Sequence, residues 1–287
     1  MSRGLAFLIA CAALAAHAQV PTKVYAQELV EQAIARNSGL LVMVMHATPA
    51  HSKDNIIIAS NIGRLGKPAD EDDLRVISTG KTHLEVNSAG NRFEVELVLR
   101  DVAGASIGAV GCVFPYRKGD DTAAYEKRAV AIRDGLARRI LNAANLMEPF
   151  PFEPGATTKT HAQKIVDETQ EKHPDVLVLA MRAPPRGAKD IVVLGSTFGR
   201  HGKKADADDL KILSATEPAT GLYSNGKRFG VDLPLRDRSG NTIGTMNVGY
   251  AYTPGDDQGA LTRKAVALRD ELALRIASSD QLDELDP

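Results

Sequence analysis

The sequence predicts an α+β protein with two tandem copies of one domain, each a five-stranded antiparallel sheet with flanking helices. Three observations lead to this prediction: a long internal repeat, the same order of helix-like and strand-like segments in each copy, and a proline-rich stretch between the copies. The repeat is too long for a solenoid, whose units are roughly 20–50 residues. Each copy is instead long enough to bury a hydrophobic core of its own.

The repeat keeps a constant offset without gaps. Asp101 recurs as Asp237, 136 positions later, and the same offset relates Gly63-Arg64 to Gly199-Arg200, Asp72-Asp73 to Asp208-Asp209 and Gly119-Asp120-Asp121 to Gly255-Asp256-Asp257. The predicted organisation is a signal peptide over 1–18, a first domain over 19–147, a linker over 148–159 and a second domain over 160–287. The prolines of the linker favour a stiff, semi-extended connection between domains that fold independently.

The elements of one copy follow from hydrophobic periodicity. Residues 26–36 carry an apolar stripe at helical spacing, 40–47 form a continuous apolar run typical of a buried strand, and 55–61 are rich in isoleucine. Residues 68–76 are polar and acidic around Leu74, which predicts a short helix or an ordered loop.

The second half of each copy reads as an antiparallel meander followed by a helix. Strands are expected over 83–87, 92–101 and 106–116, because Gly-containing turns at 88–91 and 102–105 separate alternating apolar residues. Asp120 or Asp121 should cap a closing helix that runs to about Leu141. The second copy repeats this order from Gln163 to Ile276.

The first residues resemble an export signal. Arg3 precedes an apolar run that is too short to span a bilayer, and Ala16-His17-Ala18 fits a signal peptidase site. We expect cleavage after Ala18 and a periplasmic or secreted protein; lipidation at Cys11 is the alternative. Cys112 would then be the only cysteine, and its apolar surroundings indicate a core residue.

Composition argues against several classes of function. The net charge is −1 with acids and bases interspersed, and there is no tryptophan, so a nucleic-acid surface is not expected. Neither a Gly-x-Ser-x-Gly elbow nor a His-Glu-x-x-His helix is present, and we expect no enzyme, metal or cofactor. No histidine is shared by the copies, since His46 faces Arg182, His83 faces Ala219 and His201 faces Leu65. A protein with one catalytically active copy and one inactive copy is an alternative that this comparison leaves open.

The segment from Leu99 to Gly111 resembles the end of a Cache domain, an extracytoplasmic relative of PAS, and so does Leu235 to Asn247. The shared pattern is an aspartate, a turn glycine, and an isoleucine-glycine pair that enters the last strand. Asp101 and Gly104 suit a tight turn, and Gly108 leaves space for a close neighbour. The resemblance implies a small-molecule-binding sensor domain. Unlike receptors of that family, this chain carries no kinase, cyclase or chemotaxis module.

The motif Gly-Arg-x-Gly-Lys is the most distinctive stretch that both copies retain. Arginine clamps a carboxylate with two hydrogen bonds, and glycine lets the backbone approach an anion. We therefore expect equivalent positive sites in the two domains, with ligand-binding candidates Arg64, Lys67, Asp72 and Tyr116 in the first and Arg200, Lys203, Asp208 and Tyr252 in the second. The alternative is that the charged residues only order a loop. Asp70, Asp72 and Asp73 lack an EF-hand pattern, so helix capping is favoured over calcium binding.

Three functions remain open from the sequence. The leading hypothesis is an exported sensor-like protein that binds a small polar or anionic metabolite and presents the complex to a partner, such as a membrane receptor. The second is a periplasmic interaction protein without a ligand. The third is a hydrolase or isomerase that uses Asp72 and Lys67.

Overall fold

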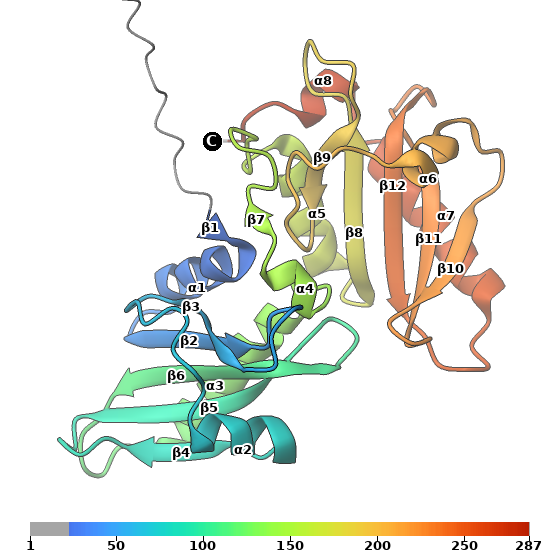
Figure 1. Ribbon diagram of the computed structural model, residues 1–287. Helices are drawn as coiled ribbons and strands as arrows, with labels where there is room; N and C mark the ends of the chain where they lie inside the picture. The colour runs from blue at the N-terminus through green and yellow to red at the C-terminus, as the bar shows by residue number, and fades with distance from the viewer. Residues whose placement is uncertain (1–22, 287) are drawn as a thin grey trace, which may run out of the picture.

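The computed structural model describes residues 23–286, so the predicted signal peptide and the alternative anchor at Cys11 lie outside the described part. Within it, two five-stranded antiparallel sheets with helices packed on them lie side by side along the chain (Figure 1). This architecture confirms the predicted fold class of two tandem PAS/Cache-like domains. No helix in the described range is long and apolar enough to cross a membrane.

The first domain contains one sheet with the order β3-β2-β6-β5-β4. Its elements are β1 (Lys23–Val24), α1 (Tyr25–Arg36), β2 (Val42–Ala47), β3 (Ile56–Ser60), α2 (Glu71–Thr79), β4 (His83–Val86), β5 (Arg92–Arg100), β6 (Ser106–Pro115), α3 (Thr122–Ala137), α4 (Ala143–Leu146) and β7 (Pro149–Phe150). The predicted elements are all present, with α3 ending earlier and α2 ending later than the sequence suggested.

The second domain repeats this arrangement with the order β9-β8-β12-β11-β10. Its elements are α5 (His161–Lys172), β8 (Val176–Ala183), β9 (Val192–Ser196), α6 (Ala207–Lys211), η1 (Ile212–Ser214), β10 (Ala219–Tyr223), β11 (Arg228–Arg236), β12 (Thr242–Ala251), α7 (Gln258–Ala273) and α8 (Ser279–Leu282). Periodicity did not predict four short elements of two to four residues each, because segments this short carry no repeating pattern. These elements are β1, β7, α4 and α8.

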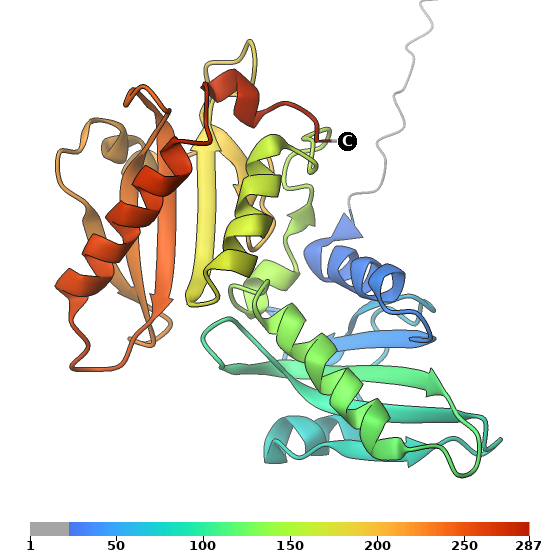
Figure 2. The same cartoon turned by 180° about the vertical axis from the view of Figure 1, so that it is seen from behind.

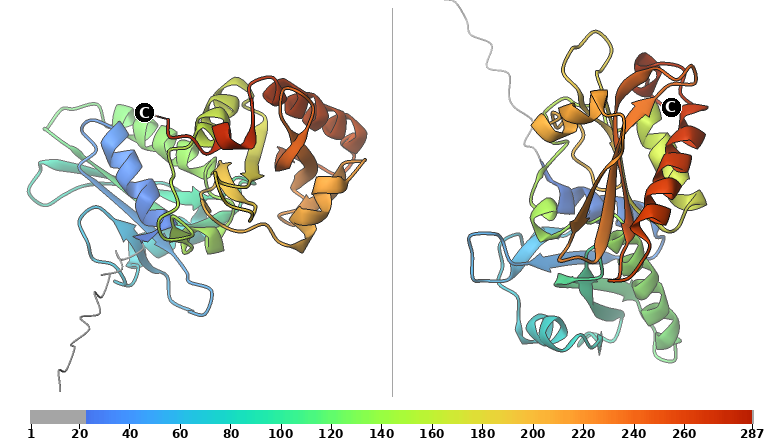
Figure 3. Two further views of the ribbon diagram at one scale, coloured as in Figure 1. Left: turned by 90° about the horizontal axis from the view of Figure 1, so that it is seen from above. Right: turned by 90° about the vertical axis from the view of Figure 1, so that its right-hand side faces the viewer.

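Each sheet buries one face against two long helices. In the first domain Leu29 of α1 and Ile132 of α3 pack in one core with Phe93 of β5. Figure 2 shows α3 and α7 running across the same side of their sheets. The short helix α2 contacts the opposite face, where Val76 packs on Val98. Figure 3 shows the corresponding separation of α6 and α7 in the second domain, so both sheets keep one face for these short helices.

The hairpin that carries the family resemblance has the predicted geometry. The Asp101 carboxylate accepts hydrogen bonds from the backbone N–H groups of Ala103 and Ala105, each at 2.9 Å. A Cβ atom at Gly108 would lie 1.9 Å from the carbonyl oxygen of His46, and one at Gly244 equally close to that of Arg182. The retained glycine is thus explained by close strand packing.

The predicted linker over 148–159 begins with residues that pair and pack within the fold. Residues Pro149 and Phe150 form β7, which pairs with β1, and Phe150 is buried. Asn145 is fully buried, and its side-chain amide donates hydrogen bonds to Glu148 and to the carbonyl oxygen of Phe198. Asn145, just before the predicted linker, therefore connects the first domain to Phe198 of the second.

Candidate functional site

A cavity of about 640 Å³ lies on the α6 side of the second sheet. Its walls come from β8, β10, β11 and β12, from the α6–η1 segment, and from Leu141 and Asn142 of the first domain. Charged side chains of both signs and neutral polar side chains line it. Among them are Arg182, Arg228, Asp209, Asp232, Asn247 and Tyr223. The cavity is large enough for a small metabolite, whose usual sites span roughly 300–1,000 Å³.

Arg228 is the most unusual group in this cavity. It begins β11, is only 8% exposed, and its Nη1 atom has no hydrogen-bond partner among residues 23–286. Its guanidinium lies 5.3 Å from the ring centre of Tyr223, which holds it in place by a cation–π contact. Burial lowers the pKa of Arg228. A buried cation with a free donor is a favourable partner for an incoming anion.

Acidic and amide groups lie on the same sheet face. The Arg182 guanidinium is 3.2 Å from the Asp209 carboxylate, and the Asn247 amide donates a hydrogen bond of 2.6 Å to Asp232. Burial, opposed by the Asn247 hydrogen bond, raises the pKa of Asp232. The cavity thus offers a free arginine together with hydrogen-bond acceptors, a combination that suits a ligand with a carboxylate and a second polar group.

Two glycines shape the cavity. A Cβ atom at Gly230 would lie 2.6 Å from the Tyr223 ring, and one at Gly221 would lie 3.3 Å from it. The Tyr223 ring can therefore lie in this position because Gly230 has no side chain, and Gly221 leaves it additional room. The corresponding residues of the first domain are Glu94 and Glu85, so the two copies cannot bind the same ligand in this way.

The matching face of the first domain is acidic instead. A Cβ atom at Gly111 would lie 3.3 Å from Glu94 Oε1 and 3.9 Å from Glu96 Cγ, and His46 Nε2 lies 3.4 Å from Asp73 Oδ1. Burial, followed by the charge of Asp73, raises the pKa of Glu96 to about 8. Burial also raises the pKa of Asp73 and lowers that of His46, so both neutral forms are favoured. No counterpart of the buried Arg228 is found here, because Arg92 is exposed.

The two predicted clamp arginines have different environments. Arg200 donates two hydrogen bonds of 2.7 Å to the carboxylate of Glu148, so its fork is occupied within the chain. Arg64 and Lys67 are exposed, and neither forms an ion pair within the described range. Lys203 lies over the Phe152 ring. The two predicted positive sites are thus not equivalent in the structure, although Arg200 also lines the second-domain cavity.

The shared motif is explained by its backbone. Arg64 and Arg200 have φ values of 66° and 69°, and the glycines on each side also have positive φ. In both copies the lysine N–H donates to the arginine carbonyl oxygen, at 3.1 Å and 2.9 Å. This tight turn, rather than a clamp, accounts for the retention of glycine at these positions.

The other predicted residues divide between the two sheet faces. Asp72 and Asp208 lie in the first turns of α2 and α6, where Asp70 and Asp206 form the N-caps; Asp208 also lines the cavity. Tyr116 and Tyr252 pack against the helix-side cores, away from the cavity.

Two further predictions from the sequence concern structural residues. Asp121 and Asp257 cap α3 and α7 as expected. Cys112 is fully buried, which raises its thiol pKa to about 12.

Sequence reasoning missed the residues that define the cavity, namely Arg182, Tyr223, Arg228, Asp232 and Asn247. Two of these residues could have been found from the sequence. Asp232 and Asn247 are polar residues between apolar neighbours in their strands, and they pair across β11 and β12. A charged or amide residue inside such a strand indicates a polar cavity on that face.

Comparisons with known proteins do not assign a family. No family model and no curated protein matches the chain. Among solved structures, the repressor BlcR of Agrobacterium tumefaciens matches with TM-score 0.31 and 8% identity, covering 41% of this chain and 67% of its own. The inducer-binding domain of PobR from Acinetobacter, in complex with 3-hydroxybenzoic acid, matches with TM-score 0.28 and 9% identity over 39% of this chain and 95% of its own.

A third match is an extracellular ligand-binding receptor from Desulfohalobium retbaense. Its TM-score is 0.24 and its identity 13%, and the alignment covers 79% of this chain but only 33% of the receptor. At TM-scores this low, the matches carry no inference about activity. Any such inference must come from the cavity itself.

Proposed function

We propose that this chain is an exported, sensor-like binding protein whose second domain takes up a small carboxylate-bearing metabolite. The observation that carries the proposal is the cavity of about 640 Å³ with Arg228 buried in it and a free Nη1 donor. An unpaired buried guanidinium costs free energy, and a bound carboxylate would offset that cost. The leader pattern of residues 1–18 supports export, which N-terminal sequencing of the mature protein would check.

The surrounding groups restrict the ligand further. Asp232 and Asp209 provide acceptors, and Asn247 provides an amide within the same cavity, so a ligand with an amine or hydroxyl near its carboxylate fits better than a simple fatty acid. Leu141 and Asn142 of the first domain close one side. Binding would therefore also stabilise the arrangement of the two domains. A partner protein would then recognise the ligand-bound chain by this domain arrangement.

The test is a thermal-shift screen of amino acids and hydroxy acids, followed by calorimetric titration of any ligand found. Because Arg228 would pair with the carboxylate, we expect Arg228→Gln to weaken binding by about 1.5–3 kcal/mol, the usual value of a charge-assisted hydrogen bond. Its melting temperature without ligand should be equal or higher, since a buried unpaired charge is removed.

The matched control is Arg92→Gln at the equivalent, exposed position of the first domain, which should bind like the wild type. Equal weakening in both variants, or a loss of stability in Arg228→Gln with unchanged affinity, would contradict the proposal. No ligand in the screen would favour the interaction protein without a metabolite.

A further inference from the structure

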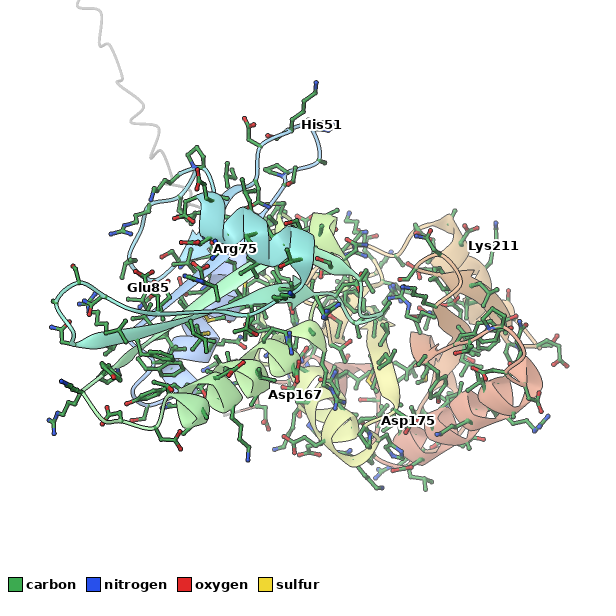
Figure 4. The ribbon with its side chains drawn as sticks, turned by 90° about the horizontal axis from the view of Figure 1, so that it is seen from below. His51, Arg75, Glu85, Asp167, Asp175 and Lys211 are labelled. Carbon is green, nitrogen blue, oxygen red and sulfur yellow. The ribbon has the colours of Figure 1, made fainter. Side chains whose placement is uncertain are left out.

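Three side chains at the edge of the first domain converge from two elements. His83 and Glu85 are two residues apart on β4 and so share one face, and Asp72 comes from the first turn of α2. One ligand atom of each lies within 4.8 Å of the other two. Figure 4 shows α2, with Arg75, lying over the sheet that carries Glu85.

The distances suit a shared ion better than direct hydrogen bonds. His83 Nε2 lies 3.7 Å from Asp72 Oδ2 and 3.8 Å from Glu85 Oε2, and it has no hydrogen-bond partner among residues 23–286. Two ligands of a tetrahedral zinc ion, each about 2.1 Å from it, lie roughly 3.4 Å apart. Small side-chain movements would therefore place all three atoms around one ion.

A second observation points to a cation here. Glu96 lies directly opposite His83 in the β4–β5 pair and is only 9% exposed. Its Oε2 atom is buried and lacks a hydrogen-bond partner within the described range. Buried carboxylate oxygens are nearly always paired, so this one calls for an explanation. A cation beside His83 would supply the electrostatic partner that this oxygen lacks.

We propose that His83, Asp72 and Glu85 form a binding site for a divalent transition-metal ion of the zinc class in the first domain. The imidazole favours zinc over magnesium or calcium, which prefer sites made only of oxygen ligands. The sequence led us to expect no metal, because no histidine is shared by the copies; that reasoning excludes only a site present in both.

Arg75 provides the competing charge. Its guanidinium lies 2.5 Å from Asp72 Oδ1 and 2.9 Å from His83 Nδ1, and its side chain is about half exposed. Zinc on Nε2 places the imidazole proton on Nδ1, so Arg75 must withdraw from His83 when the ion binds. Removing Arg75 should therefore strengthen metal binding.

The second domain provides an internal control. Ala219 and Gly221 replace His83 and Glu85 there, and Asp208 pairs with Lys211 at 2.7 Å. The proposal thus requires one ion per chain and no contribution from Asp208. It does not depend on the proposed metabolite, because the two sites lie in different domains.

The experiment is calorimetric titration of chelator-treated full-length protein with zinc ion alone, with metal content checked by elemental analysis. We expect one ion per chain, affinity at least tenfold weaker in His83→Ala and in Glu85→Gln, tighter binding in Arg75→Gln, and wild-type affinity in the control Asp208→Asn. Circular dichroism and melting curves check that each variant is folded. Because Glu85 is exposed, Glu85→Gln should keep the fold even if His83→Ala does not. No binding by the wild type, or equal affinity in Glu85→Gln, would overturn the proposal.

Discussion

At the scale of single residues, His201 shows how one position diverged between the copies. Its counterpart Leu65 is 61% exposed, whereas His201 is 4% exposed, lies edge-on to the Phe150 ring and has Nε2 2.9 Å from the Gln163 amide oxygen. Burial, followed by the charge of Arg139, lowers the pKa of His201 to about 4. The side chain is thus predominantly neutral in the folded protein at neutral pH.

This shift predicts a loss of stability in acid. The folded pKa of His201 is below the unfolded value of 6.5, so the stability from its burial is complete above pH 6.5 and declines as pH falls toward 4. We expect His201→Gln to unfold with a smaller difference between pH 7 and pH 4.5 in urea titrations than the wild type. His51→Gln, exposed at a loop tip (Figure 4), is the control and should keep the wild-type pH profile. The same profile in both variants would contradict the assignment.

At the scale of elements, the Gly-Arg-x-Gly-Lys turn is one backbone structure in two environments. Gly66 and Gly202 have φ values of 80° and 85°, so alanine would be strained at either. A Cβ atom at Gly66 meets nothing within 4 Å, but one at Gly202 would lie 2.8 Å from Ala156 and Glu153. The turn of the second copy is therefore packed against the residues that follow β7.

The two substitutions should accordingly differ in cost. Gly66→Ala should destabilise by about 1–2 kcal/mol, the strain of a positive φ at a residue with a Cβ atom. Gly202→Ala adds a steric clash and should cost about 1–3 kcal/mol more. Chemical denaturation of both variants at pH 7 measures this difference. Equal losses would show that the contact with Ala156 and Glu153 relaxes freely.

At the scale of the whole molecule, the two domains are joined by a polar contact as well as by the chain. Arg200 of the second domain binds Glu148 with two hydrogen bonds, and Arg138 and Gln170 exchange hydrogen bonds with each other's backbone carbonyl oxygens. Independent folding of the halves stays a prediction. The contacts nevertheless predict that separated halves lose a specific interface.

Arg200→Lys tests that interface. Lysine keeps the charge but cannot form the fork to Glu148, so we expect a loss of about 1–2 kcal/mol in unfolding free energy. Arg64→Lys is the matched control and should change stability by no more than about 0.5 kcal/mol, as exposed substitutions do. Urea unfolding without ligand measures both. Equal stability of the two variants would mean that the ion pair is not maintained in solution.

Much of the fold followed from the sequence because its signals are local. Alternation in β5, the apolar stripe of α1 and the Asp-x-x-Gly turn at Asp101 each depend on neighbouring residues only. The tight packing at Gly108 was also predicted, since a glycine within a strand indicates a close neighbour. The repeat then extended every assignment to the second copy.

The candidate sites, by contrast, were decided by tertiary structure. Comparison of the copies drew attention to what they share, and what they share is mostly backbone geometry and helix capping. Arg228, Tyr223 and His83 are informative because of their tertiary surroundings. The Arg228 guanidinium is buried with a free donor, the Tyr223 ring lies over two glycines, and His83 lies near Glu85 of its own strand and Asp72 of α2. Burial and the meeting of distant strands depend on the whole chain packing together, and no local pattern records that.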